Sequence, residues 1–404
     1  MKKIFLPVFF ALFYFFAIIG IPAQSGQPSG APVLGSRSAV VMDAATGRIV
    51  FEQNPDLEIP PASLTKLMTM HLAFNEIDEG RVSLKEYLYP PRESWGINQP
   101  PGSSLMHLAN GQRLTLYDLL LGLAIFSGND AAVAAALFLS PSMEEFVEAM
   151  NKAAASIGMT STVFVEPSGI SEFNMTTARD YALFCRFYIN AHPNAMRDFH
   201  SVLSFTYPRA ENILDAYRGM FLSRHHYNHN TLLGKVEGVD GLKTGYIDES
   251  GYNIALTAER DGTRFIAVVL GAPAEWGGDT IRDTDGRNLL NWAFANYKTI
   301  YPEKPDLQPV KVWKGNANYV NLIPAEPLEF TSGTDRGDAL YIETILYEPL
   351  IAPFGEGMEA GMLIISDNKG ELRRVALLTE TQIPQGNFFK RLWDSILLFF
   401  RKSN

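Results

Sequence analysis

Alternating and helical runs of apolar residues along the chain predict a protein of mixed α and β structure. Two short β-like runs, 38–43 and 48–52, are joined by Ala-Ala-Thr-Gly and predict a hairpin. A second hairpin is predicted for residues 251–259 and 263–271, because the Asp-Gly pair between them is a strong turn signal. Strand pairs are therefore expected on both sides of a long middle segment.

That middle segment has a helical period instead. Two consecutive prolines before residue 62 open a helical pattern with one apolar face. Residues 115–139 are so apolar that any helix there is expected to be buried on most sides. The first apolar face is formed by Leu64, Leu67, Met68 and Leu72, and further helical patterns run near 142–157, 177–191 and 280–299.

The pattern changes after residues 301–310, which contain three prolines. Beyond them, short apolar runs such as 341–346 and 362–366 are separated by Gly, Pro, Asn and Asp. No helical period returns until the end of the chain. We therefore predict a small all-β domain over residues 305–385.

Composition and charge narrow the functional classes. With 404 residues and 47% hydrophobic content, the chain is long enough for two domains with sizeable cores. A formal net charge of -10 argues against a nucleic-acid partner, since phosphate binding needs a basic face. Cys185 is the only cysteine, so the chain can form no internal disulfide.

The N-terminus has the features of an export signal. Lys2 and Lys3 precede an apolar run over residues 4–21, and small residues surround a candidate cleavage site after Ser25. The apolar run is long for a signal core, so an uncleaved membrane anchor is the alternative. In both cases the remainder of the chain is expected to be exported.

The first candidate for chemistry is Ser63, which precedes Lys66 by three positions at a predicted helix start. Unpaired N–H groups and the helix dipole favour an alkoxide there, and the lysine lies on the same face one turn away. If burial keeps the amine neutral, Lys66 can take the Ser63 proton as a general base. A capping serine beside a solvated lysine is the alternative, and Ser366–Lys369 repeats the same spacing.

Two further motifs favour the catalytic interpretation. Ser-Gly-Asn at 127–129 follows the first half of the apolar stretch and precedes another helix start. Lys-Thr-Gly at 243–245 lies just before the second hairpin, where a strand edge is expected. Neither triplet occurs elsewhere in the chain, and their appearance together in this order is much rarer by chance than either triplet alone.

With these three motifs the sequence resembles the serine penicillin-binding proteins and β-lactamases, which are defined by S-x-x-K, S-x-N and K-T-G. Within that group it is most similar to low-molecular-mass D-alanyl-D-alanine carboxypeptidases, in the blocks ASLTKLMT, SGNDAAVA, DGLKTGY and GYNIAL. The resemblance covers residues 36–300 well. Over 305–385 it rests on the small β-domain that these enzymes often carry.

The resemblance implies an α+β fold of the β-lactamase/transpeptidase type. An antiparallel sheet built from both chain ends would be flanked by helices, with a mostly helical insertion over residues 64–230. The implied organisation is a signal peptide over 1–25, a catalytic domain over 26–304, a small β-sandwich-like domain over 305–385 and an amphipathic helix over 386–404.

The implied function is that of a serine DD-carboxypeptidase that removes the terminal D-alanine from peptidoglycan stem pentapeptides through an acyl-enzyme and is inhibited by β-lactams. The alternatives are a β-lactamase or DD-endopeptidase of the same fold, and a weakly active penicillin-binding protein that binds the cell wall. No cofactor is implied. The expected location is the periplasmic side of the cytoplasmic membrane.

The resemblance also assigns roles by position. Ser63 would be acylated by the penultimate D-alanine carbonyl with Lys66 as base, and Ser127 would relay a proton to the leaving amine. Asn129 would hold the substrate amide and help to orient Lys66, while Lys243 would supply positive charge to the site.

The other implied roles concern the carboxylate and the oxyanion. Thr244 and Arg282 would bind the terminal carboxylate beside Gly245 of the substrate-binding strand. For Arg282, a surface arginine on a helix is the alternative. The backbone N–H groups of Ser63 and Tyr246 would form the oxyanion hole.

Two positions depart from the family pattern. Tyr246 stands where close relatives often carry His, which leaves a backbone oxyanion hole intact. Glu166 stands where the subfamily usually carries Asn. The Leu-Asn that follows the deacylating Glu of class A β-lactamases is missing after Glu166, so we interpret this residue as structural.

Two other features are interpreted as having no chemical role. Ser366–Lys369 lies between GMLII and ELRRVALL and is typical of a polar hairpin turn. His225, His226 and His229 could ligate a metal. However, H-E-x-x-H is absent, so solvated histidines are favoured and no metal site is predicted.

The last residues predict a membrane-binding helix. In the segment 387–404, apolar residues recur at helical spacing along one side, and four positive charges against one negative give +3. An apolar face with Trp and Phe, a basic face and too few apolar residues to span a bilayer indicate a helix at the membrane interface. A last helix packed on the β-domain is the alternative. The apolar side comprises Phe388, Phe389, Leu392, Trp393, Ile396, Leu397 and Phe400.

Overall fold

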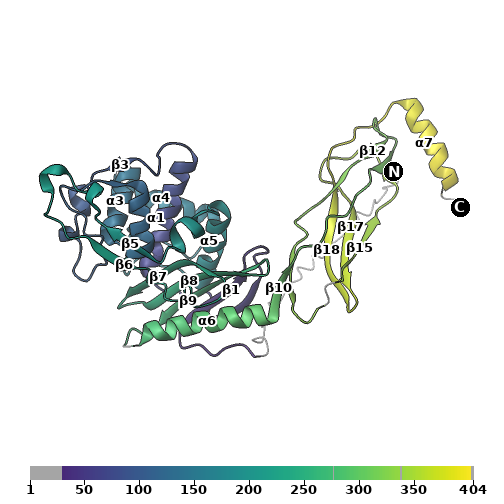
Figure 1. Ribbon diagram of the computed structural model, residues 1–404. Coiled ribbons are helices and arrows are strands. Elements are labelled where there is room, and N and C mark those ends of the chain that lie inside the picture. The colour runs from purple at the N-terminus through teal and green to yellow at the C-terminus, as the bar shows by residue number, and fades with distance from the viewer. Residues whose placement is uncertain (1–29, 276, 337–338, 402–404) are drawn as a thin grey trace, which may run out of the picture.

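The computed structural model describes residues 30–275, 277–336 and 339–401. In Figure 1 they form two regions, a larger one in which helices cover both faces of a sheet and a smaller one built from strands. The helix α7 (Phe388–Arg401) follows the smaller region. The predicted signal peptide, residues 1–25, lies outside the described residues.

The larger region is built on an antiparallel sheet of β1 (Ser38–Asp43), β2 (Ile49–Gln53), β7 (Val239–Ile247), β8 (Gly251–Arg260) and β9 (Thr263–Ala272). The strands lie in the order β2-β1-β9-β8-β7, so β1 joins the N-terminal hairpin to strands from much later in the chain. β7 is an edge strand. Both predicted hairpins and the predicted sheet from the two ends of this region are confirmed.

Helices cover the two faces of the sheet (Figure 1). On one face lie α1 (Lys66–Asp78), α3 (Asn129–Leu139), α4 (Met143–Ile157) and α5 (Ala178–Ala191), and on the other lies α6 (Gly278–Asn296). The regular structure between β2 and β7 is mainly helical, as predicted. It also contains the short strands β3 (Tyr87–Leu88), β4 (Leu114–Thr115), β5 (Ser204–Tyr207) and β6 (Arg224–Tyr227).

The two faces of β1 point into two separate cores. Val40 and Met42 belong to the core that includes α1 and α5, whereas Ala39 and Val41 pack in the core that includes Trp292 of α6. Successive residues of a strand point to opposite faces. Because both faces of β1 are covered, its sequence is continuously apolar instead of alternating.

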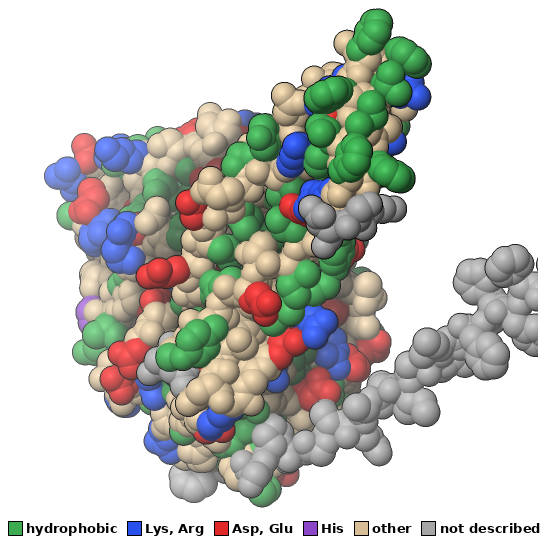
Figure 2. All heavy atoms as spheres, turned by 90° about the vertical axis from the view of Figure 1, so that its right-hand side faces the viewer, with side chains coloured by type: hydrophobic (Ala, Val, Ile, Leu, Met, Phe, Trp, Pro, Cys, Tyr) green, Lys and Arg blue, Asp and Glu red, His purple; other side chains and the backbone are tan. Residues whose placement is uncertain are grey.

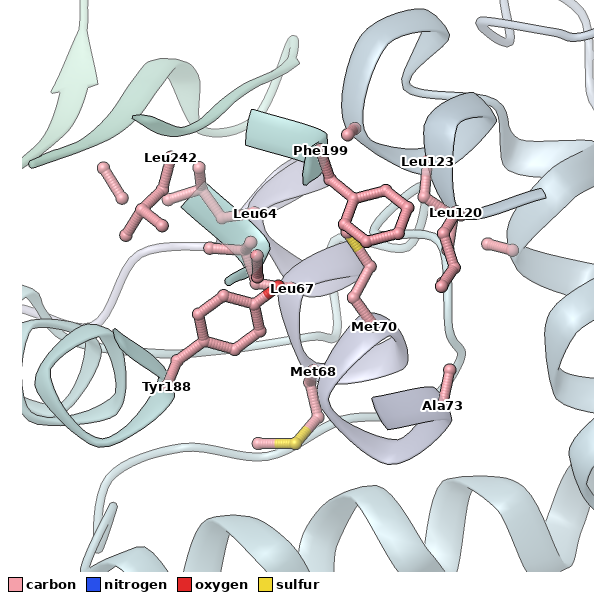
Figure 3. Packing of buried hydrophobic residues seen from close by; sticks show 14 of the residues in the cluster. Leu64, Leu67, Met68, Met70, Ala73, Leu120, Leu123, Tyr188, Phe199 and Leu242 are labelled. Atoms are coloured by element: carbon pink, nitrogen blue, oxygen red, sulfur yellow. The ribbon is translucent and has the colours of Figure 1, made fainter. Parts of the chain in front are cut away.

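α1 is buried more completely than a helix with one apolar face would be. Every residue from Lys66 to His71 is buried. Figure 3 shows side chains of α1 packed among Leu120, Tyr188 and Phe199, which come from elements on different sides of it. Leu72, predicted to belong to the apolar face, is only partly buried.

The apolar stretch 115–139 forms two helices with a break between them. α2 (Leu116–Leu121) continues into one turn of π-helix (Gly122–Phe126), and α3 begins after two intervening residues. At the break, Ser127 has left-handed backbone angles, with φ 55° and ψ 36°, which a continuous right-handed helix cannot contain. The stretch is largely buried, as predicted.

Between residues 310 and 379, the described residues of the smaller region form strands and turns, as predicted. A sheet in the order β13-β18-β17-β15 supplies much of its core. β17 ends at Asp367 and β18 begins at Gly370, which confirms that Ser366–Lys369 is a hairpin turn. The strands are β11 (Val310–Trp313), β12 (Tyr319–Val320), β13 (Leu322–Pro324), β14 (Phe330–Gly333), β15 (Tyr341–Leu346), β16 (Leu350–Ile351), β17 (Glu359–Asp367) and β18 (Gly370–Thr379).

Asp43, at the end of β1, connects the two regions. Its buried carboxylate accepts hydrogen bonds from the hydroxyls of Thr299 (2.9 Å) and Thr331 (2.6 Å). These threonines lie on β10 (Tyr297–Ile300) and β14, which pair antiparallel. The smaller region is thereby tied to the end of the main sheet, and the domain boundary predicted after residue 304 stays a prediction.

Candidate active site

Three segments far apart in the sequence meet where α1 and α3 begin beside the edge strand β7. The amine of Lys66 lies 2.8 Å from Oδ1 of Asn129. The amine of Lys243, on β7, lies 2.9 Å from Oγ of Ser127. The structure therefore brings the residues of all three motifs into one site.

Ser63 is the accessible residue of this site. Within Pro61–Met70, all of which is described, Ser63 alone is not buried. The preceding residue, Ala62, has a φ of 50°, so the backbone turns sharply into the 3-10 turn that leads to α1. The Ser63 side chain is thus presented at the surface of an otherwise buried segment.

Strand β7 approaches the backbone of this turn closely at Gly245. A Cβ atom there would lie 2.8 Å from the carbonyl oxygen of Pro61 and 3.0 Å from the nitrogen of Ser63. Both contacts are with backbone atoms, which cannot rotate away as a side chain can. Glycine is therefore the residue that lets the strand pass beside the candidate nucleophile.

Lys66 is completely buried, and three oxygens surround its amine. Nζ lies 2.8 Å from Oγ of Ser63, 2.8 Å from Oδ1 of Asn129 and 2.5 Å from the carbonyl oxygen of Ser168. Burial lowers the pKa of Lys66 to about 7, although the negative charges of Glu166 and Asp130 act in the opposite direction. At neutral pH the amine can therefore be unprotonated and accept a proton.

Lys243 is a second buried amine. Besides Ser127, its Nζ contacts the carbonyl oxygen of Thr244 at 2.9 Å. Burial holds the pKa of Lys243 well below its usual value, and the positive charges of Lys66 and Arg282 lower it further. Cations that repel one another in a desolvated site favour the binding of an anion between them.

Asn129 and Asp130 form hydrogen bonds with the loop over residues 103–108. Nδ2 of Asn129 donates to Oγ of Ser103 at 3.1 Å. The buried carboxylate of Asp130 accepts from the backbone N–H groups of Met106 (2.9 Å) and Leu108 (3.0 Å). Burial raises the pKa of Asp130, and these N–H groups oppose the rise. Sequence reasoning missed Asp130 and Ser103, although an Asp directly after Ser-Gly-Asn at a helix start was a visible signal.

Arg282 lies near the site but is held by its neighbour. It is only 6% exposed, so the alternative of a surface arginine is wrong. Its Nη2 lies 2.7 Å from Oδ1 of Asp283, and Asp283 accepts a hydrogen bond from Thr231. The guanidinium carbon lies 5.8 Å from the ring centre of Tyr252. The side chain is thus oriented from several sides.

Tyr246 directs its ring to the edge of the site. The side chain is 40% exposed, and its ring packs against Tyr252 with centroids 4.3 Å apart. Its hydroxyl donates to Oδ1 of Asp248 at 2.6 Å. That hydrogen bond raises the pKa of Tyr246 to about 12, so the phenol is neutral at physiological pH.

The three neighbouring histidines have separate surroundings. His225 is exposed, with Nδ1 2.7 Å from Oγ1 of Thr206, and His229 is exposed as well. His226 is partly buried and stacks on Phe126 at 3.9 Å between ring centroids. The part of the chain that the structure describes contains no group of three or more His, Cys, Asp or Glu placed to hold a metal ion.

Two known sequence families match the chain. A model of the D-alanyl-D-alanine carboxypeptidase family matches residues 25–274, more than half of the chain. The chain belongs to this family. A model of the C-terminal domain of penicillin-binding protein 5 matches residues 296–385. The family and the enzyme class predicted from the three motifs are confirmed.

Individual members of the family are similar over most of their length. D-alanyl-D-alanine carboxypeptidase DacC of Escherichia coli (strain K12) is 31% identical, with 97% of this chain and 94% of that protein covered. Penicillin binding protein 5 from Haemophilus influenzae has a TM-score of 0.75 at 27% identity and covers 89% of this chain and 100% of its own. Penicillin-binding protein D2 from Listeria monocytogenes, solved in a cefotaxime-bound form, has a TM-score of 0.56 at 30% identity, over 66% of this chain and 100% of its own. The predicted fold class is confirmed.

The contact of Gly245 with the turn before α1 yields a first prediction. In Gly245→Ala the added methyl group pushes β7 away from Ser63. We expect the rate of acylation by a fluorescent penicillin to fall by about a hundredfold, because a misplacement of about 1 Å at a reacting centre can cost that much. Gly355→Ala is the matched control, because no atom lies within 4 Å of its added Cβ. A wild-type rate in Gly245→Ala would show that the approach is not needed.

Proposed function

We propose that this member of the carboxypeptidase family removes the terminal D-alanine from peptidoglycan stem pentapeptides, with Ser63 as nucleophile and Lys66 as general base. The observation that carries the proposal is the buried amine of Lys66, 2.8 Å from the Ser63 hydroxyl and with a pKa lowered to about 7. The names of the related carboxypeptidases support the substrate class.

The first step is acylation. Oγ of Ser63 attacks the carbonyl carbon of the penultimate D-alanine while its proton passes to Nζ of Lys66. The carbonyl electron pair moves to the oxygen, which accepts hydrogen bonds from the N–H groups of Ser63 and Tyr246. The close passage of Gly245 supports this arrangement, since it keeps the strand beside the turn.

The second step releases D-alanine. As the tetrahedral intermediate collapses, the C–N bond breaks, and Ser127 relays to the leaving nitrogen the proton that Lys66 had taken. Lys243 supports this role because its amine, 2.9 Å from Oγ of Ser127, holds the hydroxyl in place. The neutral Lys66 then takes a proton from water as the water attacks the ester, and returns it to Ser63 when the ester bond breaks.

Substrate binding uses the cations and the strand. The terminal carboxylate would be bound by Thr244 and Arg282 beside Gly245, and its negative charge would oppose the lowering of the Lys243 pKa by burial and by the neighbouring positive charges. Asn129 would hold the substrate amide. The burial of Arg282 and its hydrogen bonds to Asp283 support this assignment, because they fix the guanidinium before the substrate arrives.

We also propose that the protein works on the outer side of the membrane, attached to its surface by α7. Figure 2 shows apolar side chains gathered over this helix, and Phe389 and Trp393 are 79% and 62% exposed. On the other side of the helix, the buried carboxylate of Asp394 accepts the N–H of Lys314 at 2.6 Å. The helix thus turns a polar side to the β-domain, which supports the proposal over the alternative of a last helix packed on that domain.

Basic residues accompany the apolar surface of α7. Lys390, Arg391 and Arg401 outnumber Asp394, the one acidic residue of the helix. Anionic lipid headgroups attract such a surface, and the apolar side chains can enter the bilayer interface. None of the helices in the described ranges combines the length and the apolar character needed to cross a bilayer.

The decisive experiment compares Ser63→Ala with Ser366→Ala, since both serines begin the same tetrad spacing. We expect wild-type protein and Ser366→Ala to release D-alanine from a pentapeptide and to carry a penicillin adduct on Ser63 by mass spectrometry. Ser63→Ala should lose activity by at least about a thousandfold. Faster turnover of a chromogenic cephalosporin than of peptide, or acylation without turnover, would support one of the alternative functions instead.

The pKa of Lys66 predicts the pH dependence of acylation. Below about pH 7 the amine is protonated and cannot accept the Ser63 proton, so the rate of penicillin acylation should fall about tenfold for each pH unit. Above that pH the rate should reach a plateau. Lys152→Ala, which removes an exposed lysine of α4, is the control and should keep the same profile. A flat profile through pH 7 would contradict the role of Lys66.

Membrane attachment can be tested without truncating the protein. Replacing Phe389, Trp393 and Phe400 together by Ser should weaken binding to anionic vesicles by about a thousandfold or more, because each buried aromatic side chain contributes ~1.5–3 kcal/mol. Turnover of a soluble peptide should not change. The control replaces three exposed apolar residues elsewhere, Ile97, Leu222 and Tyr319, by Ser. Equal loss of vesicle binding in the control would argue against a specific role for α7.

A further inference from the structure

The loop over residues 166–174 forms the wall behind the Lys66 amine. Its centre is the carboxylate of Glu166, which accepts hydrogen bonds from the backbone N–H groups of Ser168 (2.7 Å) and Gly169 (2.6 Å) and from Nδ2 of Asn174 (2.7 Å). The hydroxyl of Ser168 also donates to it at 2.5 Å. The turn is therefore held in shape by hydrogen bonds to one side chain, the Glu166 carboxylate.

This turn touches the catalytic segment at two points. The carbonyl oxygen of Ser168 lies 2.5 Å from Nζ of Lys66, and that of Pro167 accepts the hydroxyl of Thr69 at 2.8 Å. Both carbonyls belong to the residues that directly follow Glu166. The position of an acceptor for the Lys66 amine thus depends on the Glu166 side chain.

The turn also fits closely against the backbone before Ser63. A Cβ atom at Gly169 would lie 1.8 Å from the carbonyl oxygen of Ala62, so the two backbones are in contact. Gly169 has a φ of 82°, a conformation that favours glycine. A shift of this turn would therefore displace the segment that carries the nucleophile Ser63.

We propose that Glu166 is a positioning residue of the reaction: it holds the carbonyl of Ser168 against the amine of Lys66 and places a negative charge beside that amine. The inference rests on the proposed function, in which Lys66 is the general base. It goes beyond a structural role for Glu166, because a neutral side chain such as Asn could shape a turn but could not supply the charge.

The charge has a defined consequence for Lys66. A negative charge near an amine favours its protonated form, and Glu166 acts on Lys66 more strongly than Asp130 does. Asp130 is buried and engaged with backbone N–H groups of another loop. The charged and titratable groups around the Lys66 amine are Glu166, Asp130, Lys243 and His229.

Two substitutions separate the effect of the Glu166 charge on the Lys66 pKa from its effect on the position of the Ser168 carbonyl. Glu166→Gln removes the charge, so the pH at which penicillin acylation is half-maximal should fall by about one unit. Glu166→Asp keeps the charge on a shorter side chain, so that pH should stay at the wild-type value. Both variants should lower the plateau rate at high pH by about tenfold, because neither holds the Ser168 carbonyl as Glu166 does.

Glu172→Gln is the matched control, because it removes the same charge from an exposed position of the same loop. It should keep the wild-type half-maximal pH and plateau. If Glu166→Gln does not fold, as judged by thermal unfolding, Glu166→Asn replaces it, with the same expected shift. An unmoved half-maximal pH in Glu166→Gln overturns the proposal, and so does an unmoved plateau rate in both Glu166 variants.

The result can be distinguished from a failure of the proposed function. If wild-type protein is not acylated at Ser63, the proposed function itself is wrong. If wild-type protein is acylated normally and the Glu166 variants have the same pH profile and plateau as Glu172→Gln, only the inference about Glu166 is wrong.

Discussion

The buried amine of Lys66 imposes the strongest constraint on this structure. An ammonium group without water is unfavourable, and a neutral amine still needs hydrogen-bond partners. Ser63, Asn129 and Ser168 supply these partners from the 3-10 turn before α1, from α3 and from the loop that follows α4. Each element must therefore be held in position relative to the others, and the core packed around α1 provides that support.

Two close backbone approaches and two uncommon backbone conformations lie around this amine. Ala62 and Ser127 have positive φ, and Gly245 and Gly169 lie against the backbone that precedes the nucleophile. Such conformations cost free energy and persist only where surrounding packing enforces them. α1, buried from Lys66 to His71, is well suited to enforce them, which explains why a helix with so buried a first part carries this amine.

The smaller region and α7 serve a different purpose. Asp43 ties the β-strands to the end of the main sheet through two threonine hydroxyls, and Asp394 fixes α7 on the β-domain through the N–H of Lys314. Two buried carboxylates thus connect the catalytic region, the β-domain and the terminal helix. With the helix attached to a membrane surface, as proposed, these links would hold the catalytic region at a set distance from the lipid.

The sequence by itself determined the two hairpins, the helices, the small β-domain and the three motifs of the site, because turn residues, apolar period and motif spacing are local properties. It could not show what Ser103, Asp130 and Ser168 contact, because their hydroxyl, carboxylate and carbonyl groups meet their partners only after folding. Tertiary packing likewise decided on how many sides α1 is buried and which side of α7 faces the β-domain. A helix buried on one side and a helix buried on several sides can have the same apolar periodicity in sequence, and so can a helix that faces the β-domain and one that faces a membrane.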